Sequence, residues 1–256
     1  MYKRIKQYCL LMATCSLIFL FSSQAFSAEE KPAAMAEMWH FVIDPADGQA
    51  FEKAFKEHVE FRKNNGDTRD WWVYTPHTGV LGRDYYVRHC CFKWGQHQKY
   101  VDMEGMDKLS QDWYDGPAKY VKKTKHFYSW VDRENNHWPK DTKSNFLRLA
   151  HYKLKVDSDM GPVVKEISDL AKKIGWKRAW GWSYENNMDG TYLTLAMPSA
   201  DFAGFESPNP NFEEAAIKEI GEEKYKNLFD RFDSNVESRH FRIMRYRPGL
   251  SLIREQ

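Results

Sequence analysis

The sequence predicts an α+β fold in which two tandem copies of one strand–helix–strand–strand–helix–strand unit close into a single barrel with helices outside. Two observations predict it. The two halves of the chain repeat the same order of strand and helix patterns, and both halves end on a strand that opens with the dipeptide His-Phe. We expect the first repeat at residues 28–133 and the second at 145–256, joined by a linker, 134–144, that holds Asn135, Asn136 and Pro139.

The first strand of each half alternates between apolar and polar residues and ends in Asp. These strands are predicted at 38–44 and 149–157. A helical period follows each of them: one stripe holds Phe51, Phe55 and Val59, and the other holds Val163, Ile167, Leu170 and Ile174. Gly66 and Gly175 come where a helix C-cap is expected, and they end both helices.

The remaining elements also occur in pairs. Aromatic strands are predicted at 71–74 and 180–184, and each is followed by a turn that contains glycine. Return strands follow at 85–92 and 192–197. A long helical stretch comes next in each half, at about 97–122 and 211–236, and the closing strands open with His126-Phe127 and His240-Phe241.

The order βαββαβ in each half is that of the ferredoxin-like split unit. Such a sheet carries helices on one face only, so two units in one chain can cover each other's open face and form an eight-stranded barrel. In this order the chain resembles the dimeric α+β barrel superfamily, which includes antibiotic-biosynthesis-type monooxygenases, stress-responsive barrel domains and chlorite dismutase-like haem proteins. The resemblance implies a fused version of that barrel, in which pairing of two chains into a homodimer stays open.

The N-terminus has the pattern of a secretory signal. Lys3, Arg4 and Lys6 precede an apolar run from about 9 to 21, and Ala25-Phe26-Ser27 offers small residues for cleavage after Ser27. The run is shorter than the roughly 20 residues that a spanning helix needs. We therefore expect a signal peptide at 1–27 and a soluble periplasmic or secreted protein.

Removing this segment leaves 35 basic and 36 acidic residues, since it holds three basic and no acidic ones. A neutral balance argues against nucleic-acid or anionic-membrane binding. Of the four cysteines only Cys90 and Cys91 remain. Neighbouring side chains on a strand point to opposite faces, so we expect packed thiols, with a redox-active vicinal disulfide as the alternative.

The period of two in the strands predicts which side chains face the barrel interior. Four are assigned catalytic roles: His40, His151, Tyr86 and Arg242. A further set is predicted to line a ligand pocket: Trp72, Tyr74, Arg88, His126, Tyr128, Trp130, Lys153, Trp180, Trp182, Tyr184, Tyr192 and His240. A sealed core would hold Val, Ile and Leu instead. Aromatic walls with a few convergent polar groups are typical of a ligand site. The alternatives are a satisfied hydrogen-bond network, or side chains assigned to the wrong face in some strands.

The resemblance implies two kinds of chemistry. Haem-binding members hold iron through a helical histidine, but residues 212–236 contain none and His97 stands only at the start of the other half's helix. Cofactor-independent members act on electron-rich aromatic substrates. By that analogy His40 or His151 would be the general base, and Arg88, Lys153 or Arg242 would hold a carboxylate or enolate.

We therefore expect no metal site and no cofactor, and a small anionic or aromatic organic substrate. Two alternatives remain. One is a non-catalytic periplasmic binding or sensing module with the same pocket. The other is a lyase for anionic saccharides, which the abundance of Trp and Tyr would suit.

Overall fold

The computed structural model describes residues 34–79 and 81–254. The predicted signal peptide, 1–27, lies outside the described residues. Eight strands form a closed barrel with the order β1–β3–β2–β8–β5–β7–β6–β4, and every pairing is antiparallel. The strands are β1 Met35–Ile43, β2 Trp72–Pro76, β3 Asp84–Phe92, β4 Val121–Val131, β5 Phe146–Leu154, β6 Gly181–Asn187, β7 Gly190–Ser199 and β8 Val236–Tyr246.

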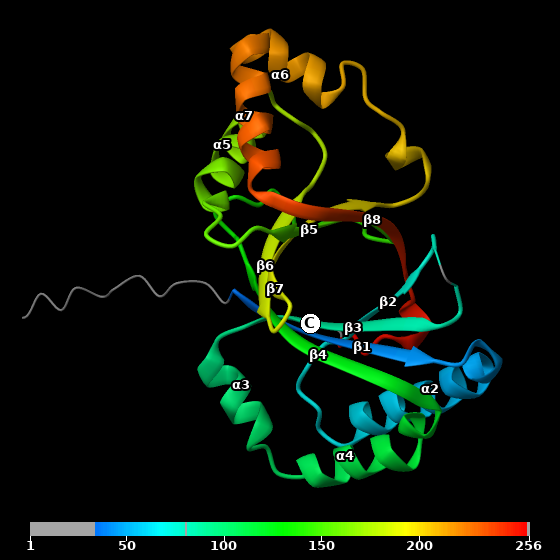
Figure 1. Ribbon diagram of the computed structural model, residues 1–256. Coiled ribbons are helices and arrows are strands. Elements are labelled where there is room, and N and C mark those ends of the chain that lie inside the picture. Colours follow the sequence, from blue (N-terminus) through cyan, green and yellow to red (C-terminus); the bar gives the residue numbers. More distant parts are fainter. Residues whose placement is uncertain (1–33, 80, 255–256) are drawn as a thin grey trace, which may run out of the picture. The chain divides into compact units, whose positions relative to one another are not determined.

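The helices lie outside this ring of strands, as Figure 1 shows. They are α2 Gly48–Asn64, α3 Trp94–Val101, α4 Met106–Asp115, α5 Met160–Lys173, α6 Phe212–Ile220 and α7 Glu222–Ser234. Short 3-10 turns occur at Pro45–Asp47, Pro117–Tyr120, Ala203–Phe205 and Pro248–Leu250. None of the helices in the described part of the chain combines the length and apolar character needed to cross a bilayer.

The predicted tandem repeat is confirmed. The first half pairs its strands in the order β4–β1–β3–β2 and the second in the order β8–β5–β7–β6, which is one topology used twice. The halves meet at two seams, where β2 pairs with β8 and β4 pairs with β6. The chain therefore has the α+β barrel fold of ferredoxin-like repeats, closed within one polypeptide.

Each long helical stretch of the prediction is divided into two helices at a glycine. Gly105 has φ 84° and Gly221 has φ 85°, a left-handed conformation that side chains disfavour, so the helix cannot continue through either position. After Gly221, α7 leads into β8. Before it, α6 begins with a capping box in which Asn211 and Glu214 satisfy each other's backbone N–H groups.

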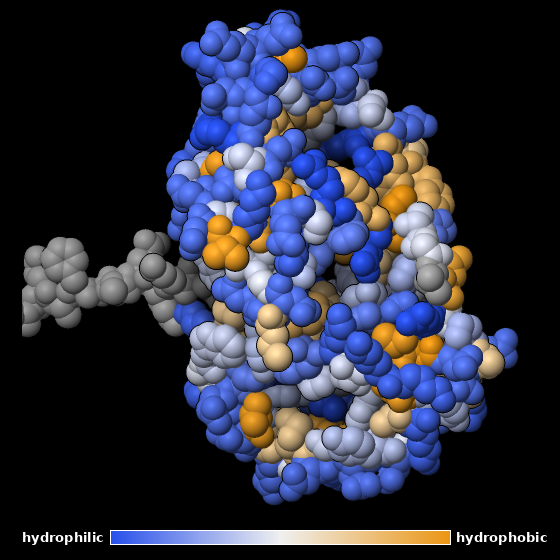
Figure 2. Space-filling model, in the orientation of Figure 1, coloured by the Kyte–Doolittle hydropathy of each residue, from blue (hydrophilic) through white to orange (hydrophobic). Residues whose placement is uncertain are grey.

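Two apolar cores fill the space between the sheet and the helices. One surrounds Phe51, Phe55 and Val73, beneath α2, and the other surrounds Val164, Leu193 and Leu228, beneath α5 and α7. Strand side chains that belong to these cores are helix-facing, and their neighbours along each strand face the barrel interior. On the side shown in Figure 2 the surface is mainly hydrophilic, with apolar residues in separate patches.

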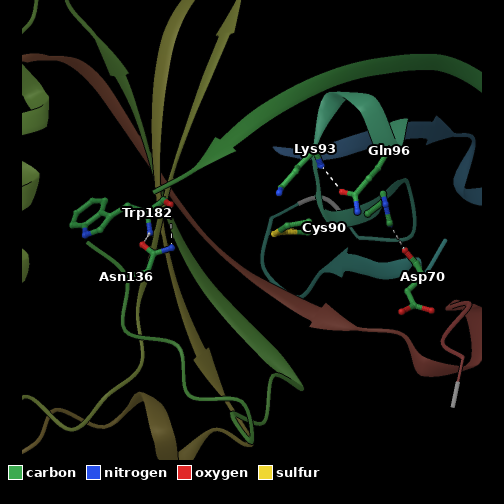
Figure 3. Close-up of a disulfide and its surroundings, with 8 residues drawn as sticks. Asp70, Cys90, Lys93, Gln96, Asn136 and Trp182 are labelled. Atoms are coloured by element: carbon green, nitrogen blue, oxygen red, sulfur yellow. Dashed lines mark hydrogen bonds between the residues drawn. A yellow bond between two sulfur atoms is a disulfide. The ribbon is translucent and has the colours of Figure 1, made fainter. Parts of the chain in front are cut away.

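The segment between the halves is tied to β6. The side-chain oxygen of Asn136 accepts the backbone N–H of Trp182, and its amide donates to the Trp182 carbonyl, as Figure 3 shows. His137 forms a β-bridge with Trp180. Trp138 lies against Gly181, where a Cβ atom would come 3.1 Å from its ring. The linker therefore covers Gly181 at the start of this strand.

The expectation of free thiols was wrong: a disulfide joins Cys90 and Cys91 (Figure 3). Strict alternation does not hold at this point of β3. Ala36 pairs with Cys90 while Met35 pairs with Phe92, so Cys91 is an extra residue in a β-bulge. The period of two on which that expectation rested is therefore interrupted at this pair.

Candidate functional site

Three of the four residues predicted to be catalytic make direct contact in the barrel interior. The rings of His40 and Tyr86 are stacked with centroids 4.2 Å apart, and these residues are directly opposite each other in β1 and β3. Arg242, from β8 in the other half, donates through Nη1 to the Tyr86 hydroxyl at 2.8 Å. Barrel closure therefore unites side chains that are 156 positions apart in the sequence.

The carboxylate of Asp84, which the sequence analysis did not single out, completes this group. Its Oδ1 lies 2.6 Å from Nε2 of His40, and the exposed fractions of the two side chains are 19% and 13%. Asp84 precedes Tyr86 by two residues in β3, so the same alternation that selected Tyr86 and Arg88 would have found it. Histidine held by a carboxylate is the usual arrangement of a general base.

Burial lowers the pKa of His40, and the charges of Lys125 and Arg242 act in the same direction against the opposing effect of Asp84. Lys125 is directly opposite His40 in β4. Burial raises the pKa of the Tyr86 hydroxyl, while Arg242 lowers it in part. Near neutral pH the site thus holds a neutral imidazole and a protonated phenol.

His151, the fourth residue, lies on the second half's side of the interior. Its Nδ1 is 2.7 Å from the Thr194 hydroxyl, and its ring stacks on Tyr192 with centroids 4.9 Å apart. Burial, reinforced by the charges of Arg242 and His240, lowers its pKa to about 4. Arg242 therefore acts electrostatically on both His40 and His151.

Arg88 faces the interior without a compensating anion. It is paired in the sheet with Trp72, and no hydrogen bond or ion pair to its guanidinium occurs within residues 34–79 and 81–254. Burial lowers its pKa, and the nearby Tyr74 phenol opposes that effect. Burial also raises the pKa of Tyr74 to about 12. A partly buried cation of this kind is costly unless a ligand supplies the negative charge.

Several predicted pocket residues are found on the interior face. Trp72 and Tyr74 share it with Arg88 and Tyr86, and the ring centroids of Tyr74 and Tyr246 are 5.5 Å apart. Tyr192 and His240 flank His151. Lys153 is also on this face of β5 but is held at the barrel end, 2.9 Å from Glu237, where it lines a surface groove of about 470 Å³ with Tyr184 and Asp189. Lys153 does not join the group around Arg242.

Six predicted pocket residues do not face the interior, so the predicted inward orientation was wrong for His126, Tyr128, Trp130, Trp180, Trp182 and Tyr184. In β4, His126 is opposite the helix-facing Trp39, and it contacts the buried Glu37. In β6, Trp182 donates to Ser168 of α5, and Trp180 belongs to the same core. The rule that small residues face helices failed in β6 because Trp138 of the linker covers Gly181.

The donor set does not fit haem. The helices α6 and α7 contain no histidine, and both ring nitrogens of His97 on α3 already have partners, Arg69 and Tyr128. Within the described ranges no cluster of three or more His, Cys, Asp or Glu side chains has the arrangement of a metal site.

Comparison with known proteins supports the fold assignment. No protein-family model and no curated protein sequence matches the chain. Among solved structures, a proposed monooxygenase from Fusobacterium nucleatum subsp. nucleatum matches with 7% identity and a TM-score of 0.51, covering 84% of this chain and 92% of its own. A mutant chlorite dismutase from Candidatus Nitrospira defluvii matches with 8% identity and a TM-score of 0.51, covering 86% and 94%. At such identities the likeness shows the α+β barrel fold alone and no activity.

Proposed function

We propose that the barrel interior is the active site of a cofactor-independent enzyme that removes a proton from a small organic substrate carrying an anionic group and an electron-rich aromatic ring. The observation that carries the proposal is the group formed by His40, Asp84, Tyr86 and Arg242. It places a base, an orienting carboxylate and a hydrogen-bond donor within contact of one another.

His40 is the proposed base. Asp84 holds Nε2, so the proton stays on that nitrogen and Nδ1 keeps its lone pair. Nδ1 has no hydrogen-bond partner in the described part of the chain. Because burial lowers the pKa of His40, this nitrogen is unprotonated near neutral pH and can accept a proton from a substrate C–H or O–H group.

Tyr86 and Arg242 are the proposed stabilisers of the anion that forms. Arg242 donates to the oxygen of Tyr86, so the phenolic hydrogen is free to donate to a substrate oxygen. The adjacent guanidinium makes that phenol a stronger donor. Arg88 then binds a carboxylate at another position on the substrate, and so compensates its own buried charge.

Proton removal leaves an electron pair delocalised over the substrate ring and oxygen. In the monooxygenase-like form of the proposal this anion reduces dioxygen: one oxygen atom enters the substrate as a carbonyl and the other leaves as water, with both substrate hydrogens. No metal or organic cofactor is needed for that balance.

The proposal is tested by oxygen consumption with 1,4-dihydroxy-2-naphthoate and with anthrone as probes. We expect uptake that survives dialysis against a metal chelator, and a loss of at least about 100-fold in His40→Asn. His77→Asn, which changes a histidine outside this group, is the matched control. Uptake that His40→Asn leaves intact would overturn the assignment of the base. Stoichiometric binding with the probe recovered unchanged would favour the binding-module alternative instead.

We also propose that the protein works outside the cytoplasm, on the pattern of residues 1–27. Expression of the full chain with N-terminal sequencing of the product tests this. A periplasmic or secreted product that begins at residue 28 is expected, whereas an uncleaved cytoplasmic product would overturn it.

A further inference from the structure

A row of aromatic rings lies on the helix-facing side of β1 and β4, outside the barrel. Trp39 stacks on His126 with centroids 3.8 Å apart, and His126 lies 5.0 Å from Tyr128. Trp94, at the start of α3, extends the row 5.0 Å beyond Tyr128. Trp39 is 36% exposed and Trp94 is 54% exposed, so solvent reaches both ends of the row. Exposed apolar surface that is contiguous marks interaction sites, whereas single exposed apolar residues do not.

A buried ion pair lies beneath these rings. Glu37 is 4% exposed and Arg69 is 6% exposed, and Arg69 donates to Glu37. Burial alone would raise the pKa of Glu37, but the hydrogen bond from His126 and the charge of Arg69 outweigh burial and lower it. Glu37 therefore stays a carboxylate. It holds Nε2 of His126 at 2.8 Å, while Arg69 reaches Nδ1 of His97.

This network fixes where the protons are. The Arg69 guanidinium has only donors, so Nδ1 of His97 must accept, and the neutral ring carries its hydrogen on Nε2. Burial and the Arg69 charge lower the pKa of His97 and keep it neutral. Its Nε2 then donates to the Tyr128 oxygen, 2.9 Å away, which leaves the Tyr128 hydrogen free.

His126 shows the complementary arrangement. Its Nε2 donates to Glu37, which can only accept, and its Nδ1 has no partner among the described residues. The row thus offers one free donor, the Tyr128 hydroxyl, and one free acceptor, His126 Nδ1, on neighbouring rings. Trp39 and Trp94 lie at the two ends of this pair, Trp39 stacked on His126 and Trp94 at a steep angle to the Tyr128 ring.

We propose that Trp39, His126, Tyr128 and Trp94 form a second binding site, which takes a neutral saccharide ring. Each sugar hydroxyl both donates and accepts, as this pair of groups requires, and the C–H face of a sugar packs on an indole ring. Glu37 and Arg69 beneath the row neutralise each other, so this pair leaves no net charge to attract an anionic sugar. The site lies on the opposite side of the sheet from His40 and is independent of the proposed activity.

The test is titration of the full mature protein with maltotetraose, cellotetraose and chitotetraose, followed by tryptophan fluorescence and calorimetry. We expect at least one of the three to bind with a dissociation constant in the micromolar to millimolar range and to change the fluorescence. Trp39→Ala and Trp94→Ala should each weaken binding by about tenfold, because each removes the exposed aromatic surface at one end of the row. Tyr128→Phe keeps the ring and removes the donor, and should weaken binding by about fivefold.

Trp138→Ala is the matched control, since Trp138 is 42% exposed but lies in the linker. It should bind as the unchanged protein does, and equal melting temperatures of all variants would show that they fold. Absence of binding to all three probes would overturn the proposal. So would binding that Trp39→Ala and Trp94→Ala leave intact, or binding of trigalacturonate with no binding of the neutral sugars. None of these outcomes bears on oxygen consumption in the barrel, which is measured separately.

Discussion

His40 Nε2 and Asp84 Oδ1 lie 2.6 Å apart across β1 and β3, and this contact is the main opposition to the burial of the imidazole. Asp84→Asn would remove the charge that raises the pKa of His40, while burial, Lys125 and Arg242 would continue to lower it. We expect the His40 pKa to fall further below 6.5 in this variant, as followed by the NMR titration of its ring protons. A rise would contradict the assignment of Asp84 as the stabilising partner.

The charge of Arg88 should lower the free energy of unfolding of the protein. Its guanidinium has no anion partner in the described structure, and burial disfavours its charged form. Arg88→Met keeps the apolar stem and removes the charge. We expect the free energy of unfolding in urea at pH 7 to rise by roughly 1 kcal/mol or more, together with weaker binding of 1,4-dihydroxy-2-naphthoate. A loss of stability would mean that Arg88 has a structural partner.

His151 should make the protein less stable in acid. Its folded-state pKa of about 4 is below the ordinary 6.5, so protonation favours the unfolded chain. The stabilisation is complete above pH 6.5 and is lost as the pH falls from there to about 4. The difference corresponds to at most about 3 kcal/mol. Urea unfolding at several pH values should show a smaller decline for His151→Gln, and parallel curves would contradict this.

Trp182 and Trp72 should respond differently to truncation. Trp182 is 3% exposed and donates to Ser168 in the core beneath α5, whereas Trp72 faces the barrel interior and is partly exposed. We expect Trp182→Ala to cost about 3–5 kcal/mol of unfolding free energy. Trp72→Ala should cost clearly less. Equal costs would contradict the placement of the two rings on opposite faces of the sheet.

Replacing Asp112 should destabilise the protein more than replacing His58. His58 is 1% exposed, and its Nδ1 lies 2.6 Å from Asp112, while its Nε2 is buried without a partner. Asp112→Ala would leave both ring nitrogens unpaired, at about 1–3 kcal/mol. His58→Phe fills similar space and leaves only Asp112, which is 31% exposed and can be hydrated. In thermal unfolding, the Asp112→Ala variant should have a lower melting temperature than the His58→Phe variant.

The element order could be predicted because the periods of 2 and 3.6 recur in both halves. Gly66 and Gly175 also predicted where two helices end. The breaks at Gly105 and Gly221, which divide the long helical stretches, were not predicted. Which face of a strand points inward is a different problem, because alternation defines two faces and does not distinguish them. In β1, β5 and β7 an apolar face identified the helix side.

In β4 and β6 that guide failed for physical reasons that lie elsewhere in the chain. The helix side of β4 covers a polar network around Glu37 and Arg69. The polar side chains of β4 therefore face the helices, and not the barrel interior. The contact between Arg242 and Tyr86 depends on how the two halves close, and only the strand pairing across the seams determines it. In β3 the bulge at Cys91 interrupts the period of two, and the residue types around it do not indicate a bulge.

Because both halves belong to one polypeptide, the barrel is free of the symmetry that two identical subunits would impose. His40 is opposite Tyr86 and bonded to Asp84 two residues before it, whereas His151 is opposite Thr194, to which it bonds, with Tyr192 two residues before. In the first half the tyrosine is opposite the histidine and the hydrogen-bonding partner is two residues before it; in the second half these two positions are reversed. A homodimer would present the same histidine environment twice and accept a ligand in two equivalent orientations. Here the two halves of the barrel interior differ, so the two orientations of an asymmetric ligand would not be equivalent.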